Sequence, residues 1–332
     1  MYHRIVTHDD FDGVVSAALV GYFLEIEKIA FAGPGDITNS RISTGASDIV
    51  CDLPYPLECG MWFDHHEANL EDVALRGIEQ ETIPGLRKPA PSCARVILEY
   101  FETEYEIDEE LVEMVEDSDR IDSFAYESIE DWRAERPENE IDRAIKLKAG
   151  KPAERKEFLR WLVLSLMDES LETVAAQGDV TQRAELFRAE EEQMLKIIRQ
   201  HLEYLGDERE IILLDFSGHT RRVSVVKNLA QLLTPQALAV LPINSLFDRQ
   251  VKTNDLVFSM SLTIAGTHHP ARRDLGEIMR QLNIGSGHAG AASGLLRSRS
   301  KQEMLKAKER TLKAILDQWK KQGQEGKSGP AE

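Results

Sequence analysis

Histidines and aspartates recur in short clusters along the first part of the chain, and these residue types bind divalent cations. His8, Asp10 and Asp12 alternate in HDDFDG, so in an extended segment their side chains share one face. Two carboxylates and one imidazole suit Mn²⁺ or Mg²⁺, whereas thiolates select softer metals. Gly13 would then permit a tight turn into the helix that follows. The alternative interpretation is that Asp10 or Asp12 is a helix N-cap.

Further clusters favour the metal interpretation, although each alone could be a cap, a surface charge or a buried histidine. They are Asp52 after SDIVC, the triplet DHH at 64–66 after CGMWF, and Asp117, Asp119 and Asp122 near the end of a helical pattern. Taken together, they predict a site for two cations about 3.5–4 Å apart, as in two-metal phosphoryl-transfer sites.

Strands and helices must bring these clusters together. Short apolar runs at RIVT, KIAF, SDIVC and MWF alternate with helical patterns, which predicts a parallel α/β sheet. Ligands of such sheets bind at the carboxyl ends of the strands, where the runs end in Asp or His. Ser92 is expected to cap a helix over SCARVILEYFE, and a second helix is expected to end near Asp122.

The length of 332 residues predicts two domains. Residues 1–180 form the first, and the helical pattern of 181–206 predicts a connector helix with a stop at Gly206. Residues 207–321 are expected to form a smaller α/β domain with a mixed sheet, a helix over HHPARRDLGEIMRQLN and a basic amphipathic helix over 301–321. A disordered tail is expected over 322–332, and residues 125–170 are expected to be helical without an assigned role.

Charge is divided unevenly along the chain. Residues 1–130 hold 8 Lys or Arg against 29 Asp or Glu, whereas the remainder holds 32 against 29. So acidic a protein would repel long duplex nucleic acid unless a local basic groove overrides the repulsion. No apolar run is long enough for a membrane span and no signal-like segment follows Met1, so a cytoplasmic protein is expected.

At these motifs the chain resembles the DHH phosphoesterases. HDDFDG, Asp52, WFDHHE and SDRID are similar to the four motifs of that family, and GSGHAGAASG is similar to the glycine-histidine loop of its associated C-terminal domain. The resemblance covers residues 3–297 in the expected order. It implies an N-terminal metal-binding catalytic domain and a C-terminal substrate-binding domain.

The resemblance also implies roles for individual residues. Asp64 and His66 would act as acid, electrostatic or supporting groups, since a ligating histidine needs a partner that fixes its tautomer. Asp119 is aligned with the fourth-motif ligand, with Asp117 as the alternative. The implied metal ligands are His8 and Asp10 for one ion, Asp12, His65 and Asp119 for the other, and Asp52 as the bridge.

In the C-terminal domain, the expected phosphate-binding residues surround the glycine-histidine loop. Gly285, Gly287 and Gly290 are expected to let backbone amides close on phosphate oxygens, and His288 to donate a hydrogen bond to the same group. Ser286, between the glycines, is expected to affect how closely the phosphate approaches. Guanidinium groups fit phosphate with two parallel hydrogen bonds, which makes Arg272 and Arg273 further candidates, with a solvated helix face as the alternative.

These expectations amount to a manganese-dependent phosphoesterase, with Mg²⁺ or Co²⁺ as alternative ions, that acts on short oligonucleotides or small nucleotides in a cleft between the domains. The absence of a lysine-rich groove favours a small phosphorylated substrate or a short single strand over a long duplex, and no membrane partner is expected. The alternatives are a hydrolase of polyphosphate or pyrophosphate and a non-catalytic nucleotide-binding regulator. Helix 301–321 could pack on its own domain or form a homodimer.

Overall fold

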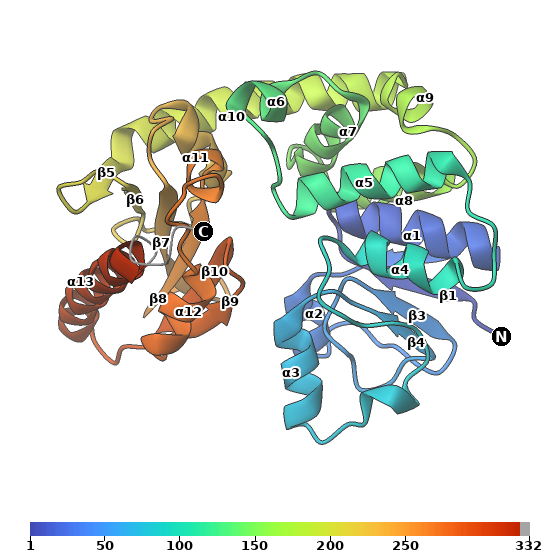
Figure 1. Cartoon of the computed structure of the whole chain (residues 1–332), viewed down its shortest axis with the longest axis horizontal. Coiled ribbons are helices and arrows are strands. Elements are labelled where there is room, and N and C mark those ends of the chain that lie inside the picture. Colours follow the sequence, from blue (N-terminus) through green and yellow to red (C-terminus); the bar gives the residue numbers. More distant parts are fainter. Residues whose placement is uncertain (326–332) are drawn as a thin grey trace. The chain divides into compact units, whose positions relative to one another are not determined.

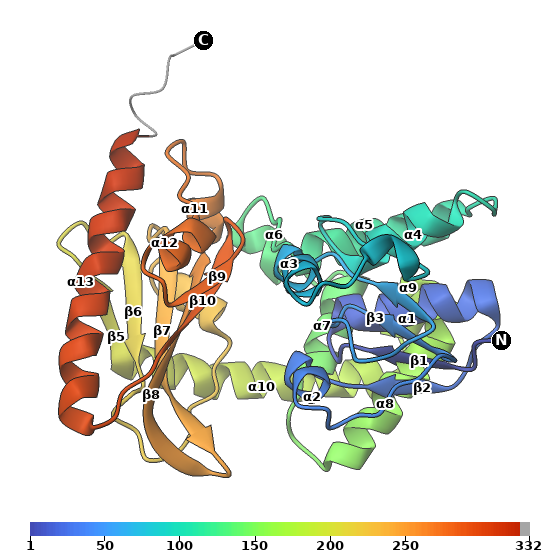
Figure 2. The same cartoon turned by 90° about the horizontal axis from the view of Figure 1, so that it is seen from below.

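A computed structural model describes residues 1–325, which divide into two compact units. The first comprises Met1–Tyr126 with Glu130–Ala189, and the second comprises Glu127–Ile129 with the chain from Glu190 onward (Figures 1 and 2). Among the described residues, no helix is both long and apolar enough to cross a membrane.

The first unit contains the predicted parallel sheet. Its strands are β1 (Arg4–Thr7), β2 (Ile29–Phe31), β3 (Asp48–Cys51) and β4 (Met61–Phe63), in the order β2-β1-β3-β4. Thr7 is in register with Cys51, and Cys51 with Phe63. Strands β1, β3 and β4 therefore end side by side, so that the residues that follow them meet at one edge.

Helices cover both faces of this sheet (Figure 1). Alternating strand residues such as Ile5 and Val6 belong to separate apolar clusters on the two faces. One face packs under α1 (Phe11–Leu24), which is buried nearly all round because α4 (Cys93–Phe101), α5 (Glu109–Asp122) and α8 (Pro152–Leu166) pack against it. The other face carries α2 (Pro34–Thr38) and α3 (Glu67–Leu75), followed by the 3₁₀ turn η1 (Gln80–Thr82).

The segment 125–170 is largely helical, as expected. It contains α6 (Ile129–Arg133), α7 (Pro137–Lys146) and α8, and α9 (Leu171–Ala175) follows. The next helix, α10 (Gly178–His201), ends earlier than the expected connector helix. Residues Leu202–Leu205 instead form strand β5, whose backbone pairs with β6, and Gly206 adopts a positive φ of 91°.

The second unit contains the predicted mixed sheet. Its order is β5-β6-β7-β8-β10-β9, and only β6 and β7 are parallel to each other. The strands after β5 are β6 (Ile211–Asp215), β7 (Ala239–Asp248), β8 (Val251–Leu262), β9 (Gly285–Gly287) and β10 (Ala291–Leu296). The helical elements are the 3₁₀ helix η2 (Lys227–Leu232), α11 (Ile264–Thr267), α12 (Leu275–Gln281) and α13 (Lys301–Glu325).

Two helices of this unit differ in extent from the sequence expectation. The helix expected from 268 begins only at Leu275, because Pro270 interrupts the pattern and Asp274 caps α12 by accepting a hydrogen bond from the amide of Glu277 at 2.8 Å. Helix α13 continues to Glu325, past the expected start of a tail at 322. Residues 326–332 of that tail lie outside the described residues.

An ion pair at the amino-terminal edge of the parallel sheet predicts a pH-dependent contribution to stability. Arg4 donates to both carboxylate oxygens of Asp48, at 2.8 and 2.6 Å, and although burial alone would raise the pKa of Asp48, this pair holds it below its usual range. We expect Arg4→Gln to lower the free energy of unfolding at pH 7 by about 1 kcal/mol. Because a depressed carboxyl pKa stabilises the fold above the unfolded value, the difference from the wild type should shrink as pH falls below about 4. Urea unfolding at pH 7 and pH 3 measures this difference in the free energy of unfolding. An equal difference at both pH values would contradict the prediction.

Candidate metal centre

Asp52 lies at the centre of a cluster formed by the ends of three parallel strands. Its Oδ2 lies 3.4 Å from Nδ1 of His8, and its Oδ1 lies 3.5 Å from Nε2 of His65 and 3.6 Å from Nδ1 of His66. The Asp52 side chain is 2% exposed. The strand register thus brings together the residues that follow β1, β3 and β4, as the sequence predicts.

The backbone of Asp52 adopts a left-handed conformation, with φ of 56°. Its amide donates to the carbonyl of Phe63 at 3.0 Å, which ties the end of β3 to the end of β4. Aspartate and asparagine enter this region more readily than most residues with a side chain. Such strained positions concentrate at functional sites, and here the strained residue contacts three histidines.

Asp10 is both a helix cap and a member of the cluster. Its Oδ1 accepts a hydrogen bond from the amide of Gly13 at 3.0 Å, which caps α1, while its Oδ2 lies 2.6 Å from Nδ1 of His8. One carboxylate oxygen of Asp10 therefore fits the cap interpretation, and the other fits the metal interpretation. A Cβ at position 13 would lie 2.2 Å from the carbonyl oxygen of His8, so only glycine fits this turn.

Asp12 sits at the amino-terminal end of α4. Its Oδ2 accepts from the amide of Cys93 at 2.8 Å, and its Oδ1 accepts from the amide of Ala94 and the hydroxyl of Ser118, both at 3.0 Å. Oδ2 also lies 3.9 Å from Nε2 of His65. Asp12 therefore joins α1, α4 and α5, and turns one oxygen toward the cluster.

The two adjacent histidines of the DHH triplet are held in different ways. Nδ1 of His65 lies 3.0 Å from the carbonyl of Ala90, so donation from Nδ1 directs Nε2 toward the carboxylates. Nδ1 of His66 lies 2.9 Å from Oδ1 of Asp64, which is fully buried and also accepts from the side chain of Asn69 at 2.6 Å. Asp64 thus orients His66, whose side chain is 49% exposed.

The structure places Asp122, rather than Asp119 or Asp117, beside the cluster. Asp119 turns away from the cluster, because its carboxylate accepts from the guanidinium of Arg95 at 2.6 and 2.9 Å and from the hydroxyl of Ser92 at 2.6 Å. Asp117 pairs with Arg120 instead. Asp122 faces the cluster, with its Oδ2 3.5 Å from Nε2 of His65.

Helical phase explains why Asp122 replaces Asp119. Positions 115, 118 and 122 follow one another at intervals of three and four, so they share a face of α5. Val115 and Ser118 are buried, and Ser118 contacts Asp12. The apolar periodicity of α5 was the sequence signal that could have identified Asp122.

The cluster has a strong preference for positive charge. Burial alone would lower the pKa values of His8 and His65, but the facing carboxylates outweigh burial and raise them to about 11 and about 10. Burial raises the pKa of Asp122 well above its ordinary value, and the charge of Asp12 adds to the increase. The crowded carboxylates thus favour a bound cation.

Helix α8 holds the loop that carries the first motif. The guanidinium of Arg155 pairs with the carboxylate of Asp9 and donates to its carbonyl oxygen at 2.8 Å. This contact joins residues 146 positions apart in the chain. Part of the segment 125–170 therefore serves to position the loop between β1 and α1.

The donor atoms of this centre fit divalent cations. His8, Asp10 and Asp52 form one group and Asp12, His65 and Asp122 a second, and within each group the ligand atoms lie within 4.8 Å of one another. Asp52, His65 and His66 form a third group with the same spacing. Among the described residues, Oδ1 of Asp52 and Nε2 of His65 are buried without a hydrogen-bond partner, which is costly unless a further group binds them.

The glycine-histidine segment of the second unit forms a β-hairpin, in which β9 pairs with β10. Gly285–Gly287 form β9, and a Cβ at Gly285 would lie 1.9 Å from the carbonyl oxygen of Ser293. The amides of His288 and Gly290 donate within the hairpin, to the carbonyl of Ala291 at 2.9 Å and to Nδ1 of His288 at 3.1 Å. These two amides are therefore engaged with the protein itself.

The two candidate arginines of this unit lie in different environments. Arg273 is 6% exposed, donates to the carbonyl of Ala271 at 2.7 Å and to the carboxylate of Glu210 at 3.2 Å, and lies 4.6 Å from the ring centre of Trp319. It thus packs against α13, and its charge is matched by Glu210. Arg272 is exposed.

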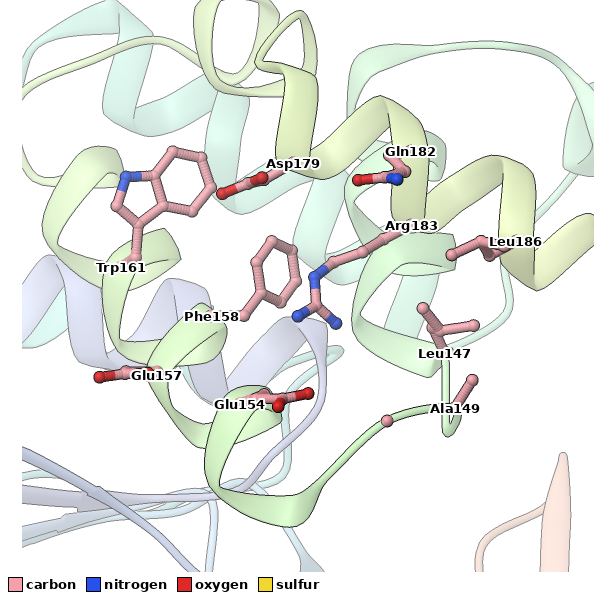
Figure 3. A pocket seen from close by; sticks show the side chains of 11 residues that line it. Leu147, Ala149, Glu154, Glu157, Phe158, Trp161, Asp179, Gln182, Arg183 and Leu186 are labelled. Carbon is pink, nitrogen blue, oxygen red and sulfur yellow. The ribbon is translucent and has the colours of Figure 1, made fainter.

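A separate cavity of about 550 Å³ lies in the first unit and contains none of the predicted site residues (Figure 3). The guanidinium of Arg183 covers the ring of Phe158 at 4.1 Å within it. Glu154, Glu157 and Asp179 also line the cavity, so its net charge disfavours a phosphate ester.

Comparisons with solved structures identify the fold. A pGpG-specific phosphodiesterase, PggH from Vibrio cholerae, matches with a TM-score of 0.67 and 22% identity over 95% of this chain and 99% of its own. A DHH-domain protein described as belonging to a family of ribosomal proteins matches at 0.58 and 12%, over 95% and 86%. RecJ from Thermus thermophilus with Mg²⁺ matches at 0.51 and 13%, over 95% of this chain and 50% of the longer RecJ chain. No family model matches the sequence, and no curated protein matches it either. The fold of this chain is therefore that of the DHH proteins.

Proposed function

We propose that the chain is a metal-dependent phosphoesterase that hydrolyses short oligonucleotides or small nucleotides at the cluster around Asp52. The observation that carries this proposal is the buried pair of Asp52 Oδ1 and His65 Nε2, which face each other at 3.5 Å without forming a hydrogen bond. A cation between carboxylate and imidazole donors satisfies both atoms.

The three groups of donor atoms support a set of ligands for two cations. His8 and Asp10 would hold the first cation, and Asp12, His65 and Asp122 would hold the second. Asp52 lies near both His8 and His65, so it would serve as a ligand of both cations. When bound, such ions activate water as a nucleophile and neutralise the charge that develops on the phosphate oxygens. The mixture of imidazole and carboxylate donors favours Mn²⁺ over Mg²⁺, since nitrogen ligands suit Mg²⁺ less well.

The residues of the chain contribute orientation and proton transfer. Asp64 fixes the ring of His66 through Nδ1 and leaves its exposed edge available to substrate. His66 is therefore our candidate for the group that stabilises or protonates the leaving oxygen. Ala90 and Arg155 act indirectly. The carbonyl of Ala90 holds His65, and Arg155 holds the loop that contains Asp9.

A linear dinucleotide is the substrate we place first. Support comes from the pGpG specificity named for PggH, whose structure this chain matches over nearly the full length of both proteins. The excess of acidic residues over 1–130 also disfavours a long duplex. Cleavage of inorganic phosphate chains is the alternative, and the cytoplasmic location and the homodimer stay predictions.

Hydrolysis by purified protein with Mn²⁺ tests the proposal. The panel comprises pGpG, RNA and DNA of two to five nucleotides, nucleoside 3′,5′-bisphosphates, cyclic dinucleotides, pyrophosphate and polyphosphate. We expect mononucleotide from the short linear oligomers, and loss of that activity with excess EDTA and its recovery with Mn²⁺. Phosphate from polyphosphate alone would support the alternative substrate class, and no turnover with bound metal would support a nucleotide-binding regulator.

A further inference from the structure

The cavity of about 550 Å³ in the first unit lies between α8, α10 and the loop that joins α7 to α8 (Figure 3). Its described lining residues include no ligand of the candidate metal centre. Its volume falls within the range of sites for small molecules, which is about 300–1,000 Å³. The chemistry of the lining residues therefore indicates which kind of ligand the cavity can hold.

Each of the two helices presents one stripe of side chains to the cavity. On both helices the lining residues follow the intervals i, i+3, i+4 and i+7, so they share one face. They are Glu154, Glu157, Phe158 and Trp161 of α8, and Asp179, Gln182, Arg183 and Leu186 of α10. A stripe with this spacing is ordinarily apolar where it faces the interior of a domain. Five of these eight side chains instead carry a charged or amide group, so polar groups face the space between the helices.

Two aromatic rings line the cavity. Phe158 is buried and Trp161 is half-buried, and the two rings are stacked with an interplanar angle of 27° and centroids 5.9 Å apart. The guanidinium of Arg183 covers Phe158, with its Cζ 4.1 Å from the ring centroid. In the part of the chain that the structure describes, no such cation covers Trp161. Because aromatic faces attract positive charge, and the indole ring does so most strongly, Trp161 offers a place for a cation.

The carboxylates that line the cavity are not neutralised by protein cations. Asp179 and Glu157 form no ion pair among residues 1–325, and Glu154 pairs only with the exposed ammonium of Lys151, at 3.3 Å. Figure 3 shows the carboxylate of Asp179 directed toward the ring of Trp161. The lining carries three carboxylates against one guanidinium. A positively charged ligand is therefore favoured beside the aromatic rings.

We propose that this cavity binds a linear polyamine. One ammonium group of the ligand lies between the carboxylate of Asp179 and the ring of Trp161, and the next lies near the glutamates of α8. The methylene chain covers the aromatic rings and the side chain of Leu186, which is 49% exposed. An organic cation gains from this apolar contact, whereas a hydrated metal ion does not. The inference uses no residue of the metal centre, so it does not rest on the proposed function.

Isothermal titration of spermidine into the full-length, metal-free protein tests the cavity. Salt at about 0.15 M screens long-range attraction to the acidic chain, so binding through net charge alone is suppressed. We expect saturable binding to the wild type, weakened about 5-fold or more in Asp179→Asn and in Trp161→Leu. Glu185→Gln is the matched control, because it removes one exposed carboxylate of α10 that does not line the cavity. This control should bind spermidine as the wild type does.

Further measurements separate the cavity from other acidic parts of the chain. Asp52→Asn removes a charge from the metal centre and should leave spermidine binding unchanged, and excess Mg²⁺ should not displace spermidine. Should Trp161→Leu fail to fold, Asp179→Asn still decides, because it alters an exposed side chain.

Four results would each overturn the site. They are the absence of saturable binding to the wild type, wild-type affinity in Asp179→Asn or in folded Trp161→Leu, equal weakening in Asp179→Asn and Glu185→Gln, and loss of binding in Asp52→Asn or with excess Mg²⁺. None of these results bears on nucleotide hydrolysis, so the proposed function is tested separately.

Discussion

Replacing Asp52 by asparagine is expected to lower kcat for hydrolysis of short nucleotides by about 10³-fold or more. The carboxylate contacts His8, His65 and His66 and is the one group shared by the two proposed metal positions. An amide keeps the shape but loses the negative charge and one acceptor oxygen. Asparagine also tolerates the left-handed backbone at this position, so the fold should persist.

Asp48→Asn provides the matched control for this variant. Asp48 begins β3, the strand that Asp52 follows, and it lies at the opposite edge of the sheet, where it pairs with Arg4. We expect this control to lose stability through the ion pair while retaining kcat. Steady-state hydrolysis with Mn²⁺ and thermal unfolding by circular dichroism measure both quantities. Activity of Asp52→Asn near the wild-type level would refute the assignment of the centre.

The second large effect is expected at the end of α5, where Asp122→Asn should lower kcat by about 100-fold or more and Asp119→Asn should not. Asp122 faces His65, whereas Asp119 is bound by Arg95 and Ser92. Removing the carboxylate of Asp122 takes away its repulsion with Asp12 and Asp52 but also its attraction to His65. The thermal unfolding temperature of the metal-free Asp122→Asn protein should therefore stay close to that of the wild type.

Metal stoichiometry separates the two aspartates most directly. Titration of Mn²⁺ into metal-free protein should show loss of one binding site in Asp122→Asn and none in Asp119→Asn. The Asp119 variant should instead lose up to about 1 kcal/mol of stability, because it breaks a partly exposed pair with Arg95. The reverse pattern, with metal binding lost only in Asp119→Asn, would restore the assignment made from the order of the motifs.

Strand ends were the most predictable part of the site. Short apolar runs ending in Asp or His identified β1, β3 and β4, and the parallel arrangement places their ends at one edge. His8, Asp52 and His65 meet there because local sequence sets where each strand stops. The choice between Asp119 and Asp122 depends on helical phase, which a motif in linear sequence does not contain.

Long-range contacts decided the features that the sequence left unpredicted. GSGH has the composition of a loop, yet the backbone of β9 pairs with β10, and Gly276 of α12 approaches Gly287 so closely that a Cβ would lie 2.1 Å from its carbonyl oxygen. Arg273 is adjacent to Arg272 in sequence, but Trp319 and Glu210 bury only one of them. Such partners are distant in sequence, so local patterns cannot assign them.

The double engagement of Asp12 has an evolutionary consequence. Its carboxylate holds the first two amides of α4 and the hydroxyl of Ser118, so it supports the packing of three helices whether or not a cation is bound. Asp122 instead faces His65, with its Oδ2 3.5 Å from Nε2 of that residue. In a descendant that had lost its activity, selection for folding alone would retain Asp12 and release Asp122. An aspartate at position 12 is therefore poor evidence that a relative is active, whereas an aspartate at position 122 is better evidence.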